Sequence, residues 1–477
     1  MRYALLLAVA VTVAAQMSAQ DQNYWFQQGG TRSHLLGGAV VGGVDDTSAG
    51  YYNPARLSWI DNPSLSVSAS VYQMDRYFIR DGAGKDRDLD SLNYRVVPSL
   101  VSGIHLFEFA PGHAFGHTIL ARHYYNLSVS ERREARENVI GDVRSAGDED
   151  YTAQITVDAD LQEYWFGLSW AWQITDYLSF GATTFGGLRI EKLSVDVDAR
   201  AVWFNGTAFE AAAVDNSAYV NYVDLRAFWK LGLAFELDGF KAGLTATTQA
   251  IHLWGQGTVS RNLEVLNIDP DEDGEGASLV LNDRQESRPT EFRSPWSFAA
   301  GAEYTIESTG TRIAASAEWF LPVGAWTVIR PESGAFFQGA TNLIGGSNDF
   351  LKVRHTTNGV FNVAAGVSQK FGDWIIGEWS GHWGFYTDFS ANITKHDDAV
   401  HLGVTEWDLY HGMTGVTIRT EKSEFAVGVH FAIGSDSVEQ NINLDNPTEA
   451  GLLLGVPDSA RGVYWAIGIV AGYTYFF

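Results

Sequence analysis

Three basic and three aromatic residues of this 477-residue chain could together bind an amphipathic anion. A carboxylate removed from water needs a cation beside it, and its tail needs an apolar wall. The strand pattern described below places residues of both kinds on the face that we expect to line the interior of the fold. They are Arg122, Arg226, Lys230, Trp165, Phe185 and Phe228. The simpler alternative is that the cations pair with the interior acids Asp224, Glu163 or Glu236 as ordinary packing.

An acidic run, residues 269–274, has the spacing of oxygen ligands in a calcium-binding loop, with glycine at its sixth position. The ligands would be Asp269, Asp271 and Asp273. The twelfth position is Val280, however, so the bidentate glutamate that completes such a shell is missing. We interpret the run as a solvated acidic loop and expect no metal, although calcium binding stays open.

The sequence contains none of the motifs that position a serine nucleophile, a zinc-binding histidine pair or a phosphate. His382 lies near Ser380 and could serve a lipid hydrolase, but nothing in the spacing requires it. The absence of cysteine excludes disulfides, metal thiolates and cysteine nucleophiles. We therefore expect no enzyme activity and no cofactor.

The formal net charge is −25, from 57 acidic and 32 basic residues. Such an excess argues against nucleic acid and anionic headgroups as partners, and it reflects solvated acidic loops. Aromatic residues make up 13% of the chain, with 49 glycines and only 11 prolines. This composition suits long strands joined by tight turns.

The end of the chain indicates the fold. Residues 463–477 alternate without interruption, with large residues such as Trp465, Tyr473 and Phe477 on one face. A last strand of this kind is typical of an outer-membrane β-barrel, which must close because unpaired backbone cannot lie in hydrocarbon. Alternation predicts fourteen strands, at about 64–75, 95–108, 116–130, 152–173, 177–200, 219–237, 240–262, 292–305, 312–324, 357–371, 374–388, 404–420, 425–436 and 462–477.

The predicted strand 219–237 shows how the faces are assigned. Reversing the two faces would put Arg226 and Lys230 into lipid, which would destabilise the barrel by roughly 2 to 4 kcal/mol for each residue. The charged face therefore lines the interior. Alternate connections are short, such as Asp238-Gly239. The long polar connections include residues 76–94, 131–151, 263–291 and 325–354. This asymmetry predicts short periplasmic turns and long outer loops.

The chain before residue 64 shows no strand pattern. Arg2, an apolar run and a small-residue site ending at Ala19 predict a secretory signal peptide over residues 1–19. Residues 20–63 lack alternation and are rich in glycine, so they cannot face lipid. We expect them to fill the lumen of the barrel formed by residues 64–477.

The stretch Val44 to Leu57 ends just before the first predicted strand and reads VDDTSAGYYNPARL. It resembles the hatch motif of the FadL-like long-chain fatty-acid transporters, in which Asn-Pro-Ala follows an acidic and small-residue stretch. The matching residues are Asn53, Pro54 and Ala55. That family often has glycine next, where this chain has Arg56. The resemblance extends over the mature chain through the fourteen strands and the closing Phe.

The resemblance implies an all-β fold, a 14-stranded antiparallel transmembrane barrel with an N-terminal hatch inside its lumen, in the bacterial outer membrane. It implies a monomer in outer-membrane lipid that takes up long-chain fatty acids or other hydrophobic molecules passively. In the family, the ligand passes from outer loops to a lumen site and leaves sideways through a gap made by a kinked strand. The predicted third strand, 116–130, has no proline or internal glycine to mark a kink.

For capture outside, the loop after the ninth predicted strand carries an apolar cluster. Its members include Trp326, Phe336, Phe337 and Phe350. Exposed apolar clusters usually mark binding surfaces, although this loop could equally fold against a neighbouring loop. Relatives of the family also resemble substrate shuttles of a secretion system. A protein-interaction barrel is therefore the alternative function, and a lipid-processing enzyme is a third.

Overall fold

The computed structural model describes residues 23–271, 273–334, 346–374, 376–392, 400–401, 407–440 and 442–477. The predicted signal peptide, residues 1–19, lies outside this part of the chain. Among the described residues, no helix combines the length and the apolarity that a membrane span needs. The short helices are α2 (Arg32–Leu35), α3 (Ala49–Tyr52), η2 (Pro54–Trp59) and α5 (Ser347–Phe350).

The strands are β1 (Ser64–Arg80), β2 (Leu89–Leu106), β3 (His113–Glu137), β4 (Glu149–Thr175), β5 (Leu178–Phe204), β6 (Phe209–Leu237), β7 (Phe240–Thr247), β8 (Ile251–Ile268), β9 (Ala277–Pro289), β10 (Ser297–Ile306), β11 (Thr311–Phe320), β12 (Val323–Ile329), β13 (Val353–Thr357), β14 (Val360–Trp374), β15 (Gly377–Asp388), β16 (Val400–His401), β17 (Leu409–Arg419), β18 (Ser423–Glu439) and β19 (Ser459–Phe476).

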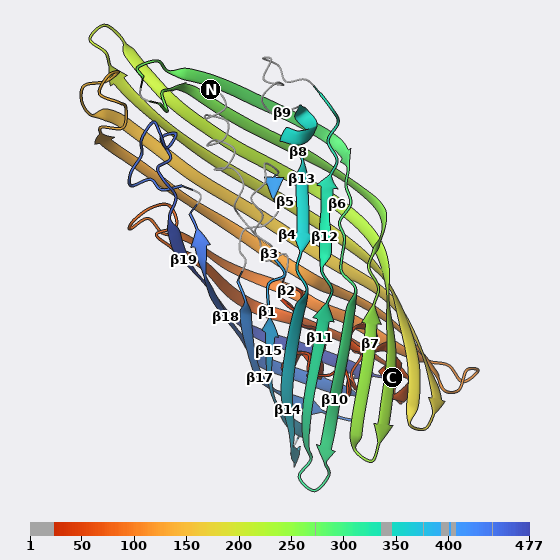
Figure 1. Ribbon diagram of the computed structural model, residues 1–477. Helices are drawn as coiled ribbons and strands as arrows, with labels where there is room; N and C mark the ends of the chain where they lie inside the picture. Colours follow the sequence, from red (N-terminus) through yellow and green to blue (C-terminus); the bar gives the residue numbers. More distant parts are fainter. Residues whose placement is uncertain are drawn as a thin grey trace.

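Fourteen of these strands close into one antiparallel barrel (Figure 1). Their order is β5-β4-β3-β2-β1-β19-β18-β17-β15-β14-β11-β10-β7-β6, and the pairing of β5 with β6 completes the ring. The C-terminal strand β19 lies between β1 and β18, as the alternation at the chain end predicted. Asp238 and Gly239 join β6 to β7 with φ angles of 49° and 79°, the left-handed pair that a two-residue hairpin turn requires. The 14-stranded all-β fold is confirmed.

Strands β3 to β6 are much longer than a membrane crossing needs. They contain 25, 27, 27 and 29 residues, whereas β10 and β11 contain 10 each. A tilted strand crosses a bilayer in about 9 to 11 residues. Figure 1 shows β3 to β6 running far beyond the upper ends of β10, β11 and β14. A large part of these strands therefore stands outside the membrane.

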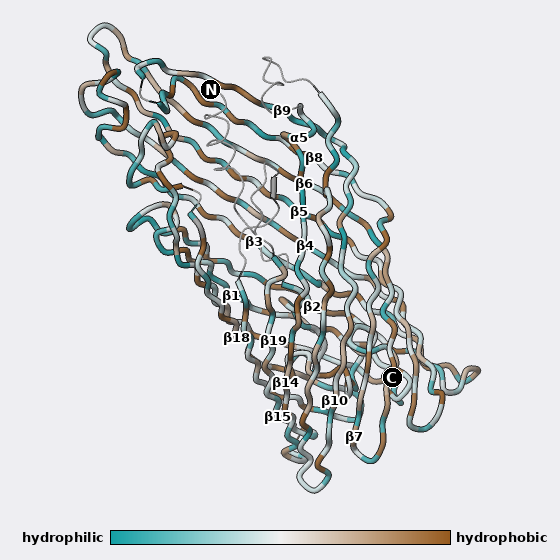
Figure 2. Tube along the Cα trace, in the orientation of Figure 1, coloured by the Kyte–Doolittle hydropathy of each residue, from teal (hydrophilic) through white to brown (hydrophobic). Residues whose placement is uncertain are grey.

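The polarity of the two faces inverts along β6. At membrane level its inward face carries Asp224, and its outward face carries residues such as Leu231, which is 41% exposed. Further from the short turns, the inward residues Val220 and Tyr222 are apolar or aromatic and buried, and Asn221 faces outward. Figure 2 shows the alternation of hydrophobic and hydrophilic residues along such strands.

Strands β4 and β5 invert at the same level. Glu163, Arg189 and Asp224 are cross-strand neighbours in one row across β4, β5 and β6. We call the part beyond this row, away from the short turns, the upper barrel, and the remainder the lower barrel. In the upper barrel the inward residues of these two strands are almost all apolar: Tyr151, Ala153, Ile155, Val157, Ala159 and Leu161 in β4, and Leu193, Val195, Val197, Ala199, Ala201 and Trp203 in β5.

This inversion explains where the loop predictions were wrong. The expected loop 263–291 contains β9 and the end of β8, and the expected loops 76–94 and 131–151 are shortened by the extension of β1 to β4. In these segments the outward residues are polar because water surrounds them, so the sequence has a loop-like composition. The strands continue nevertheless, with their apolar residues directed inward.

Four neighbouring strands of the ring are interrupted near the row Glu163–Arg189–Asp224. The breaks separate β7 from β8, β9 from β10, β11 from β12 and β13 from β14. Beyond the breaks, β8 and β9 continue the main sheet, whereas β12 and β13 form a separate sheet with β16. A bridge between Thr290 and Ile329 links the two sheets. Among the described residues, only the lower barrel is therefore a continuous ladder.

The chain before β1 lies inside the ring. Residues 23–59 are largely buried. The backbone N–H of Trp25 donates to Asp388 in β15 at 2.7 Å, and Thr183 in β5 donates to the carbonyl of Gly50 at 2.8 Å. Strands β15 and β5 stand on different sides of the ring, so a segment bonded to both must lie within it.

Candidate functional site

A cavity in the lower barrel brings together most of the residues predicted to bind an anion. It has a volume of about 70 Å³ and lies beside the row Glu163–Arg189–Asp224. Its lining includes five of the six predicted residues: Arg122, Trp165, Arg226, Phe228 and Lys230. The sixth, Phe185, packs against Phe228 with 5.3 Å between the ring centroids.

Two aromatic rings, Trp165 and Phe228, form an apolar wall of this cavity, and Phe185 packs behind them. The Trp165 ring lies 4.5 Å from that of Phe228 and 5.5 Å from that of Phe185, measured between centroids. Phe185 and Phe228 are cross-strand partners on β5 and β6, which directs both rings inward. Aromatic rings in such contact bury a large apolar area, and the one polar atom among them, the indole N–H of Trp165, donates to Glu163 at 2.6 Å. The wall can therefore hold a hydrocarbon tail.

Two cations face the cavity and form no ion pair with a described carboxylate, although Glu318, which also lines the cavity, attracts both through space. Arg122 is 6% exposed, and one of its terminal nitrogens has no hydrogen-bond partner. The Lys230 ammonium and the Arg122 guanidinium lie 4.9 and 6.0 Å from the centroid of the Tyr51 ring, and Arg122 also lies 5.3 Å from that of Trp165. Ring faces attract cations but do not replace a counter-ion.

The other three cations of the cavity, Arg226, Arg189 and Arg293, are paired, and Arg293 contacts Glu291 at 2.8 Å. Arg226 contacts Glu163 at 2.5 Å and Asp224 at 3.5 Å. Arg189 contacts Glu163 at 3.2 Å and Glu191 at 2.8 Å. The alternative of ordinary interior pairing therefore applies to Arg226. It does not apply to Arg122 and Lys230 within the described part of the chain.

Several lining residues were missed from the sequence. Arg189 follows the same inward alternation as Phe185 in β5, so the pattern could have identified it. Phe292, whose ring centroid lies 3.8 Å from the guanidinium carbon of Arg189, belongs to the break between β9 and β10, where no period exists. Tyr51 enters from the N-terminal segment, and burial raises the pKa of its phenol, which stays neutral.

The motif Asn53 to Ala55 packs directly against glycines of the barrel wall. The Asn53 amide donates to the carbonyl of Leu233 at 3.1 Å, and its oxygen accepts from the N–H of Ala55 at 3.1 Å. A Cβ at Gly232 would lie 2.3 Å from the Asn53 oxygen, and one at Gly181 would lie 2.4 Å from the carbonyl carbon of Pro54. These glycines are cross-strand partners, and they allow the close approach.

Ion pairs hold the N-terminal segment to the wall. Arg56, which stands where the family often has glycine, pairs with Glu236 of β6 at 2.6 Å. Asp45 bridges Arg32 at 2.6 Å and Arg312 of β11 at 2.5 Å. Partial burial opposes ionisation of Asp45, but the two guanidinium charges outweigh this and hold the pKa of Asp45 well below its ordinary value.

Strand β3 departs from regular pairing at Arg122 although no proline or glycine marks the position. Its register against β4 shifts between Ala121 and His123, which is a bulge, and bulges bend the strand that carries them. The ladder between β2 and β3 ends at the pair Leu100 and Leu120, although both strands continue. The third strand is therefore irregular beside the cavity.

The apolar residues expected on an exposed outer loop are folded inward where the structure describes them. Trp326 is 6% exposed and Phe350 is 1% exposed, and both belong to the core of the upper barrel. The Trp326 ring packs against Phe292 at 5.8 Å between centroids. The expectation of exposure is wrong for these two residues, and the packed alternative holds. Phe336 and Phe337 lie outside the described residues.

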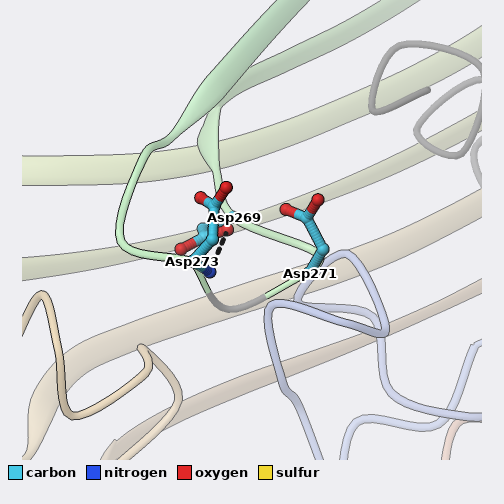
Figure 3. Close-up of side chains that lie close together, drawn as sticks. All are labelled: Asp269, Asp271 and Asp273. Atoms are coloured by element: carbon cyan, nitrogen blue, oxygen red, sulfur yellow. Dashed lines mark hydrogen bonds between the residues drawn. The ribbon is translucent and has the colours of Figure 1, made fainter.

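The aspartates of the acidic loop lie close together (Figure 3). One carboxylate oxygen each of Asp269, Asp271 and Asp273 falls within 4.8 Å of the others. The Asp269 carboxylate accepts hydrogen bonds from the N–H groups of Gly274 at 2.6 Å and Asp273 at 3.3 Å. Backbone N–H groups of the same loop thus provide hydrogen bonds to Asp269, the one buried carboxylate of the three. The interpretation as a solvated acidic loop stays a prediction, as does the absence of metal.

The contacts of His382, which the sequence suggested as a possible hydrolase residue, are structural. It is buried, and its Nδ1 and Nε2 each lie 2.8 Å from a hydroxyl, that of Ser368 and that of Thr417 respectively. Ser380 is not one of these partners. The imidazole therefore links β14, β15 and β17 within the lower barrel.

Solved structures resemble this chain in fold. A FadL homologue from Pseudomonas aeruginosa matches with a TM-score of 0.56 and 13% identity, over 95% of this chain and 99% of that one. The Pseudomonas putida toluene transporter TodX matches with a TM-score of 0.52 and 13% identity, over 96% and 100%. The Ralstonia pickettii toluene transporter TbuX matches with a TM-score of 0.50 and 12% identity, over 96% and 99%. Neither a family model nor a curated protein matches the sequence. The chain has the fold of the FadL-like outer-membrane barrels, which confirms at the level of the fold the resemblance that its Asn-Pro-Ala motif indicated.

Proposed function

We propose that this chain takes up hydrophobic small molecules that carry an acidic head group, such as long-chain fatty acids, across the outer membrane by passive binding and release. One observation carries the proposal: two buried cations that form no ion pair in the described structure lie beside an aromatic wall. The head group would bind Arg122 and Lys230, and the tail would lie against Trp165 and Phe228, with Phe185 behind them. The FadL homologue and the toluene transporters of similar fold support a hydrophobic ligand.

The cavity lining contains five cations, Arg122, Arg189, Arg226, Lys230 and Arg293, against two carboxylates, Glu163 and Glu318, so its electrostatics favour an anion over a neutral hydrocarbon. A buried charge without a partner is costly, and Arg122 and Lys230 are two like charges beside one ring. A carboxylate between them would offset both desolvation costs. A hydrogen bond to a charged group contributes about 1.5 to 3 kcal/mol, so we expect the head group to strengthen binding by about 10- to 100-fold.

In this proposal residues 20–63 form the hatch and residues 64–477 the barrel, which works as a monomer. The packing of the Asn53–Ala55 motif against glycines and the ion pair of Arg56 support a rigid hatch. The bulge of β3 beside Arg122, at the upper edge of the lower barrel, supports a sideways exit there. Capture by the outer segment that carries Phe336 and Phe337 remains a prediction.

The proposal is tested by comparing a fatty acid with the alcohol of the same chain length. Lys230→Met and Arg122→Met should each weaken binding of the acid by about tenfold or more, because each removes one charge-assisted contact. Binding of the alcohol should change by less than about twofold, because the apolar wall is intact. Titration calorimetry on the purified barrel in detergent measures both.

Lys192→Met is the matched control, because Lys192 is exposed on the outward face of the upper barrel. This variant should bind both ligands like the parent protein. Equal affinity of the parent protein for acid and alcohol would contradict the head-group assignment. Absence of binding for both, together with co-purification of a large protein complex, would favour the shuttle alternative.

A further inference from the structure

The loop between β18 and β19 fills the outer end of the upper barrel with its own apolar side chains. We call residues 442–458 the lid; it is the blue loop at the upper left of Figure 1. Val456 is 65% exposed, but five other large apolar residues of the lid are at most 1% exposed: Ile442, Leu444, Leu452, Leu453 and Leu454. They belong to the same core cluster as the inward faces of β3 to β6. The lid therefore occupies an apolar interior that the strands form.

The lid backbone is held in an unfavourable conformation. Leu452 and Leu453 have φ angles of 51° and 59°, a left-handed region in which side chains other than glycine are strained. At Gly455, with φ of 70°, an added Cβ would lie 1.9 Å from the carbonyl oxygen of Asn443, so the two arms of the lid are pressed together. Strained residues of this kind persist only where surrounding contacts enforce them. The closed lid is thus maintained by its neighbours.

A buried carboxylate provides much of that restraint. Glu449 is 3% exposed. It accepts hydrogen bonds from the N–H of Gly141 at 2.9 Å and from the N–H of Asp269 at 3.0 Å, and it pairs with Arg144. These partners belong to the loops that follow β3 and β8. Loss of this one side chain's charge would therefore loosen the lid from two loops at once.

The lid and the lumen cavity share one inner wall. Tyr151, near the outer end of β4, donates from its hydroxyl to the carbonyl of Leu453 at 2.7 Å. The inward face of β4 then continues through apolar residues to Leu161, and next come Glu163 and Trp165 of the cavity. An apolar path therefore runs from the lid to the cavity, and it is closed by packing in this structure.

We propose that the apolar interior of the upper barrel is a binding site for the hydrocarbon part of an entering ligand, and that the lid leucines occupy this site until the ligand displaces them. The inference rests on the function proposed above. An alkyl chain that replaces leucine side chains keeps the interior dry and apolar, so the exchange changes little buried area. Release of the left-handed backbone at Leu452 and Leu453 favours displacement, and the Glu449 contacts oppose it.

Locking the lid tests the inference directly. The chain has no cysteine, so Ala83→Cys with Leu444→Cys introduces the only disulfide that can form; the Leu444 N–H donates to the Ala83 carbonyl at 2.9 Å, which places the two backbones side by side. Oxidation should slow association of 11-dansylamino-undecanoic acid by about tenfold or more, and reduction should restore the rate. The dissociation constant of this probe for the lumen cavity should stay within about twofold, because the disulfide leaves that cavity unchanged.

The matched control is Arg136→Cys with Asp150→Cys, which joins two exposed cross-strand partners of β3 and β4 outside the lid. Its oxidation should leave the association rate unchanged. A second variant, Glu449→Gln, keeps the shape and removes the charge, and it should speed association by about threefold or more.

Equal association rates of the oxidised and reduced lid pair would overturn the lid inference while the proposed function stands. An unchanged or slower rate in Glu449→Gln would likewise count against it. If the parent protein binds no dansyl fatty acid at all, the proposed function fails and the inference fails with it.

Discussion

The lower and upper parts of the barrel are built from the same strands and have opposite polarity. Below the row Glu163–Arg189–Asp224 the interior holds charged residues and the outer surface is apolar. Above that row, residues such as Val220 fill the interior and Asn221 faces outward. The inward and outward directions do not change along the pleat; the chemistry of the residues changes.

The difference follows from the solvent on each side of the wall. At membrane level the outside is hydrocarbon, which accepts no charge, so polar groups must be directed to the lumen. Beyond the membrane the outside is water, and the same wall is stabilised by burying its apolar face. Each part therefore has its own way of filling the interior: the N-terminal segment below, and side chains with the lid above.

The largest expected effect comes from placing a charge inside the upper barrel. Val220→Asp should destabilise the barrel by about 3 to 5 kcal/mol, because an unpaired carboxylate would be buried. Asn221→Asp, one residue further on the outward face, should change stability by less than about 0.5 kcal/mol. Urea unfolding in lipid bilayers measures both. Similar stabilities of the two variants would mean that the upper interior is hydrated.

A charge on the outer face should have the opposite pattern of effects: it should destabilise the lower barrel and be tolerated in the upper barrel. Leu231→Arg should cost about 2 to 4 kcal/mol, because position 231 faces lipid. Asn221→Arg lies on the same face of β6, in the upper barrel, and should have almost no effect. The same urea-unfolding assay compares the free energies of unfolding of the two variants. A comparable loss in Asn221→Arg would show that the membrane extends above the row Glu163–Arg189–Asp224.

The smallest effect concerns how the lower interior is filled. Gly232→Ala should destabilise the packing of Asn53 by about 1 to 3 kcal/mol, because a methyl group cannot fit against the Asn53 oxygen. Gly186→Ala is the control, since a Cβ there meets no atom within 4 Å. Hydrogen exchange of residues 23–59 should rise only in Gly232→Ala. Unchanged exchange would show that the motif does not depend on this glycine.

Much of the lower barrel could be predicted from alternation. The pattern placed Arg226 and Lys230 on the inward face of β6, and the structure confirms both positions. The pattern could not tell that Arg226 is paired and Lys230 is not, because the partner Glu163 lies on β4, separated by one strand. Strand β9 was missed because its outward residues face water and resemble those of a loop.

By itself, the sequence determined that the chain forms a closed barrel and which side chains point inward, because the period of two is a local property of each strand. The tertiary structure decided which cations keep a counter-ion, where glycines admit the Asn53–Ala55 motif, and which loop fills the upper interior. These features depend on residues that are distant along the chain and meet only when the ring closes.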